Sequence, residues 1–246
     1  MKQAAQFSIF ILAGMGLFLF FNVKNDFKIS NLAQLDLEIA VPERNIKIPS
    51  DLPPQKQLEN PPEIIKAVYA TGWTAGSEKG ITRLIDLIKK TELNAIVIDI
   101  KDYSGNLSYY IGLDLAKKYK AEEEIKIAKP NAMIKKLHDE GIYVIARQTV
   151  FHDPILALAR PDLALMSSST GKQWKDHKCV MWIDAAAKDA WDYNIAIAKD
   201  ALGRGFDEIN FDYIRFPTDG KINEMKFSHF DANNMQKVTQ INNFFR

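Results

Sequence analysis

The stretch GFDEINFDYIRFP, residues 205–217, has the apolar pattern of a buried strand but carries Asp212 and Arg215 directly before a proline. A buried carboxylate costs several kcal/mol unless it is paired or solvated. Because side chains alternate along a strand, Asn210 and Asp212 share one face, and the apolar side chains share the other. We predict that Asp212 points into an open site and acts as a nucleophile or base. The alternative is a purely structural ion pair with Arg215 or Arg147.

Three other apolar stretches also end in polar or aromatic residues. These end residues are Trp73, Asp99, Lys101, Asp102, Arg147, His152 and Asp153. Glycoside hydrolysis uses two carboxyl groups, one that attacks or activates water and one that protonates the leaving oxygen. Within this chain the second carboxyl would come from Asp99, Asp102 or Asp153. We expect Asp99 to form an ion pair with Lys101 on the same strand face, and Asp102 could simply cap the DYSG turn.

Arg147, His152, Asp153 and Arg215 are further polar residues that could contact substrate at such a site. The guanidinium of Arg147 could hold the Asp212 carboxylate in place, or it could contact the substrate. His152, in the FHDP turn with Asp153, could contact a sugar hydroxyl or donate a proton, although a single loop histidine more often does neither. The sequence has no H-x-x-H or H-E-x-x-H spacing, so it predicts no metal site and no cofactor.

Flat aromatic side chains suit the apolar faces of sugar rings, although they are equally common in a core. Trp73, Trp174 and Trp182 lie at or after the ends of predicted strands. Trp174 lies within the polar run SSSTGKQWKDHK, so we predict that it is exposed and contacts substrate. Tyr213 and Phe216 flank the charged segment and are expected to line the cleft.

The elements that would position these residues alternate along the chain. Strand-like stretches cover 64–72, 94–105, 142–154 and 208–217, and helix-like stretches cover 81–90, 129–141, 187–205 and 229–246. This alternation predicts an α/β fold of parallel βαβ units with right-handed crossovers. A (β/α)8 TIM barrel and a doubly wound sheet both place sites at the carboxyl ends of the strands. The first turn, TGWTAGSEKG, lacks G-x-G-x-x-G, which favours the barrel.

The N-terminal part of the chain has a different character. Residues 3–23 carry no charge, and 21 helical residues span a hydrocarbon core of roughly 30 Å. We predict a signal anchor over residues 1–28, single-pass in the cell membrane, with the domain outside the cytoplasm because Lys2 favours the inside. Cleavage as a signal peptide, followed by secretion, is the alternative. A proline-rich linker over 29–62 and a domain over 63–246 would follow.

The overall composition excludes some partners. The 32 basic and 31 acidic side chains give a net charge of +1, and there is no basic tract, which argues against nucleic-acid binding. Cys179 is the only cysteine, so the chain can form neither an intrachain disulfide nor a cysteine zinc site. The expected partners are a polysaccharide or oligosaccharide substrate and the membrane. The oligomeric state is not predicted.

Three segments carry a family resemblance. They are AIVIDIKDYSGNLSYY, KKLHDEGIYVIARQTVFHDPILALARPDLAL and WDYNIAIAKDALGRGFDEINFDYIRFPTDG. The run from Val68 to Gly220 resembles a bacterial family of glycosyl hydrolase domains, long labelled a domain of unknown function, which is similar to the α-amylase-like (β/α)8 hydrolases. The resemblance implies an α- or β-glycan substrate and a strand-four aspartate, at the place of Asp212, as the nucleophile of a retaining mechanism. The chain departs from the α-amylase motif at Asn210, where that motif has arginine.

The resemblance also implies a glutamate acid on a fifth strand, which would lie beyond Arg246. A complete barrel takes about 250 residues, whereas residues 63–246 number 184. We therefore expect about four β/α units, a truncated barrel that is inactive alone, and a second carboxylate beyond the chain end. A non-catalytic carbohydrate-binding barrel at the cell surface is one alternative. A metal-dependent deacetylase on a similar barrel is another, but it would need paired histidines that the sequence lacks.

Overall fold

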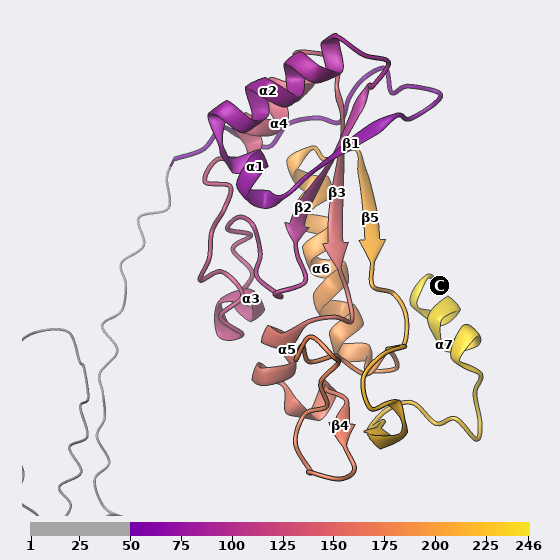
Figure 1. The fold of residues 1–246 in the computed structure, drawn as a ribbon. Coiled ribbons are helices and arrows are strands. Elements are labelled where there is room, and N and C mark those ends of the chain that lie inside the picture. The colour runs from indigo at the N-terminus through magenta and orange to yellow at the C-terminus, as the bar shows by residue number, and fades with distance from the viewer. Residues whose placement is uncertain (1–49) are drawn as a thin grey trace, which may run out of the picture. The chain divides into compact units, whose positions relative to one another are not determined.

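The computed structural model describes residues 50–246 (Figure 1). A central sheet of four parallel strands has the order β1-β2-β3-β5. The strands are β1 (Ala67–Ala70), β2 (Ala95–Lys101), β3 (Tyr143–Thr149) and β5 (Glu208–Asp212). Strands β2, β3 and β5 point downward in Figure 1, so their carboxyl ends meet at the lower edge of the sheet.

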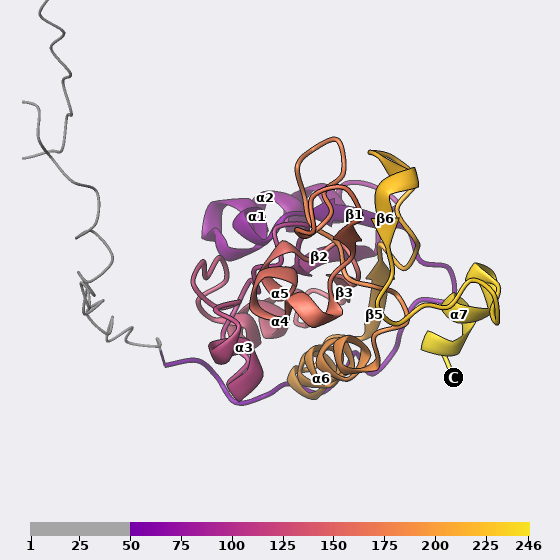
Figure 2. The same ribbon diagram turned by 90° about the horizontal axis from the view of Figure 1, so that it is seen from below.

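Helices connect the successive strands. The α-helices are α1 (Gly72–Gly76), α2 (Glu78–Lys89), α3 (Asp114–Lys118), α4 (Pro130–His138), α5 (Pro154–Ala159), α6 (Lys188–Arg204) and α7 (Lys237–Phe244), with short 3-10 helices at Pro161–Leu163 and Ile222–Glu224. In the end-on view of Figure 2, α2, α4 and α6 lie on the same side of the sheet. The predicted parallel α/β fold is therefore confirmed.

The strand order can be compared with the two architectures that the sequence left open. A doubly wound sheet reverses its strand order at a switch point, whereas the strands of a barrel follow one another around the ring. The four strands of the central sheet follow one another without a reversal. Neighbouring strands of a (β/α) barrel have this order, and so does one half of a doubly wound sheet.

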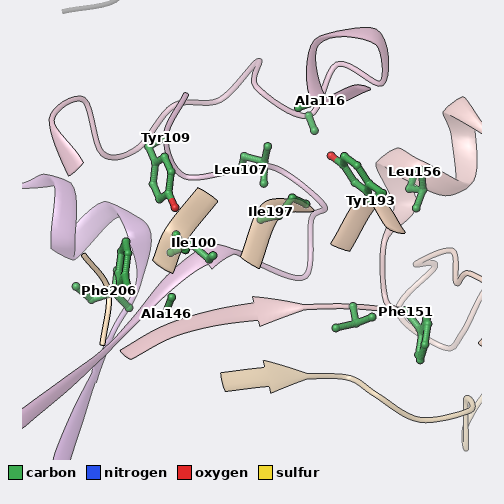
Figure 3. Close-up of a cluster of buried hydrophobic side chains, with 14 of the residues drawn as sticks. Ile100, Leu107, Tyr109, Ala116, Ala146, Phe151, Leu156, Tyr193, Ile197 and Phe206 are labelled. Atoms are coloured by element: carbon green, nitrogen blue, oxygen red, sulfur yellow. The ribbon is translucent and has the colours of Figure 1, made fainter. Parts of the chain in front are cut away.

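One face of the sheet, here called the helix face, is covered by helices and contains the core. Its side chains Ile96, Ile98, Val144 and Ala146 are fully buried. Figure 3 shows Ala146 in a cluster with other sheet residues and with side chains of α6. Fully burying an aliphatic side chain contributes about 1.5–3 kcal/mol, so this packing fixes which side of each strand faces the helices.

Residues 50–62 form neither helix nor strand, and they are hydrogen-bonded to the domain. Asp51 accepts hydrogen bonds from the backbone N–H groups of Asn131 and Ala132, in the first turn of α4 (2.8 and 3.1 Å). Helix α4 has no cap from its own N-cap side chain, so this carboxylate satisfies N–H groups that would otherwise lack a partner.

Strand β5, the last strand of the central sheet, is shorter than the predicted 208–217. It ends at Asp212, and Tyr213 adopts a left-handed backbone conformation with φ of 53°. Ile214 and Arg215 therefore lie outside the strand. The structure also contains a small antiparallel sheet of β4 (Met166–Ser167) and β6 (Met225–Lys226), which the sequence did not predict.

The predicted membrane anchor over residues 1–28 and most of the linker lie outside the described residues. Within residues 50–246, no helix combines the length and the apolar character needed to cross a membrane.

Candidate active site

A row of polar side chains crosses the open face of the sheet, the face opposite the helix face. Tyr69, Asp99, Arg147 and Asp212 belong to β1, β2, β3 and β5 respectively. Arg147 donates from Nε to Oδ2 of Asp212 at 2.9 Å and from Nη2 to the same oxygen. Its Nη1 donates to Oδ1 of Asp99, whose Oδ2 accepts the hydroxyl of Tyr69. The guanidinium of Arg147 therefore bridges the carboxylates of Asp99 and Asp212, both of which the sequence predicted as candidate catalytic groups.

The electrostatics of this row favour a charged guanidinium. Burial opposes the charge of Arg147, but hydrogen bonds to Asp99 and Asp212 outweigh it and raise the pKa of the guanidinium. Burial raises the pKa of Tyr69, and the hydrogen bond to Asp99 raises it further, to about 12. Tyr69 is thus a neutral donor at physiological pH, and Arg147 is a permanent cation.

Asp212 is held firmly yet remains accessible. Its side chain is 42% exposed, compared with 4% for Asp99. Oδ2 accepts both Arg147 donors, and Oδ1 accepts the backbone N–H of Tyr213 at 2.6 Å. As predicted, Asp212 and Asn210 lie on the open face, while Phe211 packs against Phe244 of α7 on the opposite side.

The positive φ of Tyr213 places its ring on a second group of side chains below the sheet edge. This ring stacks on the imidazole of His152, with centroids 4.6 Å apart and planes 14° apart. The indole of Trp182 lies 4.6 Å from the same imidazole. The guanidinium of Arg215 lies over Trp182 at 4.9 Å and over Tyr213 at 5.5 Å. A left-handed residue other than glycine is uncommon and is often found at a functional site.

Asp176 organises this aromatic group. Its Oδ2 lies 3.2 Å from Nε2 of His152 and accepts Nε1–H of Trp182 at 3.0 Å. Burial tends to raise the pKa of Asp176, but the hydrogen bonds from Trp182, His152 and nearby backbone N–H groups outweigh it and lower that pKa. Burial lowers the pKa of His152 despite this carboxylate. The imidazole is therefore mainly neutral at physiological pH, and its buried Nδ1 has no hydrogen-bond partner in the described structure.

The expected ion pair between Asp99 and Lys101 is wrong. A β-bulge follows Asp99, so that Asp99 pairs in register with Arg147 and Lys101 pairs with Gln148. Because Arg147 and Gln148 are consecutive, the bulge turns Lys101 to the helix face. There Lys101 forms a fully buried ion pair with Asp153, with Nζ and Oδ2 2.6 Å apart.

The other candidate carboxylates also have local partners. Asp153 accepts the backbone N–H of Leu156 at the start of α5, in addition to its ion pair. Asp102 accepts the N–H of Ser104 at 2.9 Å, as expected for a turn cap, and also binds Lys126. Burial tends to raise the pKa of Asp102, but these hydrogen bonds outweigh it and lower that pKa. Neither side chain belongs to the row that contains Asp212.

Two of the aromatic predictions are wrong. Trp174 is 2% exposed and donates its indole N–H to the carbonyl of Lys221, so the polar run around it does not make it a surface platform. Phe216 is buried against Phe227 and Phe230 and does not line the cleft. Trp73, by contrast, is 58% exposed and lies in α1.

Sequence reasoning missed Tyr69 and Asp176. Tyr69 is part of an ordinary apolar strand pattern. The one available signal was that side chains alternate along a strand, which puts Tyr69 and Ala70 on opposite faces of the sheet. Asp176 lies in a loop after Trp174, where nothing in the spacing connects it to His152. Only the folded chain brings these residues to the row and to the aromatic group.

Two surface hollows lie away from Asp212. One, of about 580 Å³, lies beside α3 and α5 and is lined in part by Asn106, Lys118 and Leu158. The other lies beside α2 and α4. Within residues 50–246, no three His, Cys, Asp or Glu side chains are placed to hold a metal ion.

A model of the family described as "Putative glycosyl hydrolase domain" matches residues 67–246. The chain belongs to this family. No curated protein sequence matches the chain. The family match includes all four strands of the sheet and every residue of the polar row.

Several solved structures are similar to this chain, one of them in sequence as well as in fold. A hypothetical protein from Ruminiclostridium thermocellum ATCC 27405 is 38% identical, with a TM-score of 0.65, over 72% of this chain and 88% of that one. An α-galactosidase from Lactobacillus brevis is 15% identical (TM-score 0.47), over 74% of this chain and 24% of that one. A cycloalternan-forming enzyme from Listeria monocytogenes is 12% identical (TM-score 0.45), over 73% and 20%.

Proposed function

We propose that this chain is a glycoside hydrolase domain of a (β/α) barrel, with Asp212 as nucleophile or base toward an extracytoplasmic polysaccharide. The observation that carries the proposal is the row of Tyr69, Asp99, Arg147 and Asp212 at the carboxyl edge of the four-stranded parallel sheet. Barrel enzymes place their chemistry at this edge. Membership in the glycosyl hydrolase family supports the reaction class, and the uncharged residues 3–23 support export.

The contacts of Asp212 suggest which of its atoms reacts. An ionised carboxylate accepts hydrogen bonds at two lone pairs on each oxygen. Oδ2 already accepts two donors from Arg147, whereas Oδ1 accepts only the N–H of Tyr213. We therefore assign to Oδ1 the attack on the anomeric carbon, or the activation of a water. Arg147 then acts as a positioning residue that fixes the plane of the carboxylate.

The proton donor for the leaving oxygen must be a different group. A general acid must lie within hydrogen-bond reach of the leaving oxygen. Both oxygens of Asp99 are already engaged, by Arg147 and Tyr69. Asp102 and Asp153 lie outside the row that contains Asp212, and they are paired with Lys126 and Lys101. We therefore assign the acid to none of the three and propose that it comes from a further strand of the complete barrel.

A non-catalytic carbohydrate-binding domain is the second candidate. Its support is the partly exposed ring of Tyr213 next to Asp212 and the exposed indole of Trp73 elsewhere on the domain. This function would need the aromatic rings but not the Asp212 carboxylate.

The two functions differ in their response to Asp212→Asn. The experiment measures release of reducing ends from a panel of bacterial and plant polysaccharides by the full-length protein. Loss of the nucleophile should lower turnover by at least about 10³-fold. Asp192→Asn is the matched control, because Asp192 is exposed on α6 and forms no ion pair with a described residue. Turnover by Asp212→Asn at the parent rate would refute the assignment, and glycan binding without turnover by the parent would support the binding domain.

A further inference from the structure

Arg215 has an exposed guanidinium with unused donors beside the candidate active site. It follows Asp212 by three residues, and its side chain lies over Trp182 and Tyr213. Only Nη1 is hydrogen-bonded, to the carbonyl of Phe216 at 3.3 Å and to Oγ1 of Thr218 at 3.1 Å. Within residues 50–246, Nε and Nη2 have no hydrogen-bond acceptor. One edge of the guanidinium fork is therefore free.

Three other arginines are already paired with carboxylates. Arg147, Arg160 and Arg204 each form an ion pair with at least one aspartate. Arg83 is also without an ion pair to a described residue, but it lies on the exposed surface of α2. Arg215 thus combines a free fork with a position next to the reactive carboxylate.

The aromatic side chains beneath Arg215 are held in place by their own contacts. Trp182 is 1% exposed, and Asp176 fixes it through its indole N–H. The ring of Tyr213 is held in turn by stacking on His152. An arginine that stacks on fixed aromatic rings loses less conformational entropy when its fork binds a ligand, because the planar group is already oriented.

Local charges do not explain Arg215 as a structural counter-ion. Asp176, beneath the aromatic group, accepts hydrogen bonds from Trp182 and from the backbone of Lys178 and Val180, and it also lies within hydrogen-bond distance of His152. Its hydrogen-bonding capacity is met without Arg215. The polar row carries two carboxylates and one guanidinium, so its formal charge is −1 (two negative, one positive). An anionic substrate would be repelled there unless another cation lay nearby.

We propose that Arg215 binds the carboxylate of an acidic sugar, so that the substrate of this domain is a glycan that contains uronic acid units. The inference rests on the proposed function and names its substrate class. A guanidinium edge matches the two oxygens of a carboxylate. A single free guanidinium balances the one negative charge of a uronate, whereas a phosphate monoester carries about −1.5 to −2 at pH 7.

Binding measurements test this without turnover. The full-length protein, labelled with ¹⁵N, is titrated with glucuronate, galacturonate and mannuronate and with the matched neutral sugars glucose, galactose and mannose. The readout is the Nε resonance of Arg215, assigned with the Arg215→Lys variant. At least one uronate should shift this resonance saturably, and its neutral counterpart should bind at least about 10-fold more weakly. No saturable shift with any of the three uronates would overturn the proposal.

Variants separate the guanidinium from the rest of the surface. Arg215→Gln should weaken uronate binding about 10- to 100-fold, as expected for loss of a hydrogen-bonded charged pair, and should change neutral-sugar binding less than about 2-fold. Arg83→Gln, the matched control, should change neither. Equal binding of acidic and neutral sugars that Arg215→Gln leaves unchanged would refute the acidic substrate and leave hydrolysis by Asp212 intact. Tighter binding of glucose 6-phosphate or 6-sulfate than of every uronate would also overturn the assignment.

Discussion

Replacing Arg147 by methionine should lower the free energy of unfolding by roughly 3 kcal/mol, and nearly all of the loss should arise from Asp99. Methionine keeps the unbranched apolar stem and removes the guanidinium. Asp99 would then retain only the hydroxyl of Tyr69 as a side-chain partner. The prediction separates the two halves of the row that Arg147 joins.

The magnitudes follow from exposure. The side chain of Asp99 is 4% exposed, so breaking its pair leaves a buried carboxylate, which typically costs 3–5 kcal/mol by itself. The remaining Tyr69 hydrogen bond offsets about 1 kcal/mol of that cost. Asp212 is 42% exposed, and an ion pair at such a site contributes at most about 1 kcal/mol because water solvates the freed charge.

Urea unfolding followed by circular dichroism measures these terms, with second substitutions in the Arg147→Met background. Asp99→Asn removes the stranded buried charge and should restore about 2 kcal/mol. Asp212→Asn removes an exposed charge and should restore less than about 0.5 kcal/mol. Equal rescue by the two substitutions, or a loss below about 1 kcal/mol from Arg147→Met alone, would contradict this account of the row.

Two further predictions concern buried groups behind and below the sheet. Lys101→Met should cost about 3–5 kcal/mol in urea unfolding because it leaves Asp153, which is 1% exposed, as an unpaired buried charge. Lys136→Met, which breaks the exposed pair with Glu78, should cost less than about 1 kcal/mol, and similar losses from both would refute the argument. Because burial lowers the pKa of His152 below the value of about 6.5 expected in the unfolded chain, the unfolded chain takes up a proton first, so stability should fall as the pH drops below about 7. His152→Gln should flatten this part of the melting-temperature profile, and an unchanged slope would rule out His152 as its source.

The alternation of apolar runs and amphipathic helices was sufficient to predict the sheet and the side on which Asp212 lies. On β5, Ile209 and Phe211 lie on the helix face, while Asn210 and Asp212 lie on the open face, as a period of two requires. The same rule failed at β2, because the bulge after Asp99 inserts one residue and reverses the side of Lys101. A bulge leaves no clear mark in a run such as IVIDIK, so the partner of Lys101 could not be predicted.

Loop residues were predicted less well than strand residues. The polar neighbours of Trp174 suggested exposure, but its indole lies against Gly220 and donates to the carbonyl of Lys221, both more than forty residues further along the chain. Asp176 could not be connected with His152 for the same reason, since the contact depends on how the loop returns to the sheet edge. Burial in loops is set by long-range contacts that local composition does not encode.

A carboxylate and a guanidinium can stand near the end of one strand because the backbone turns between them. Had β5 continued, Asp212 and Arg215 would have pointed to opposite faces of the sheet, since they are three residues apart. The left-handed conformation of Tyr213 ends the strand instead and sends Arg215 onto the indole of Trp182, while the N–H of Tyr213 binds Oδ1 of Asp212. A left-handed backbone at a bulky residue costs about 1–3 kcal/mol, and stacking on His152 offsets part of that cost. The aromatic group below the sheet therefore determines where both charged side chains lie, and disrupting it should move Asp212 and Arg215 together.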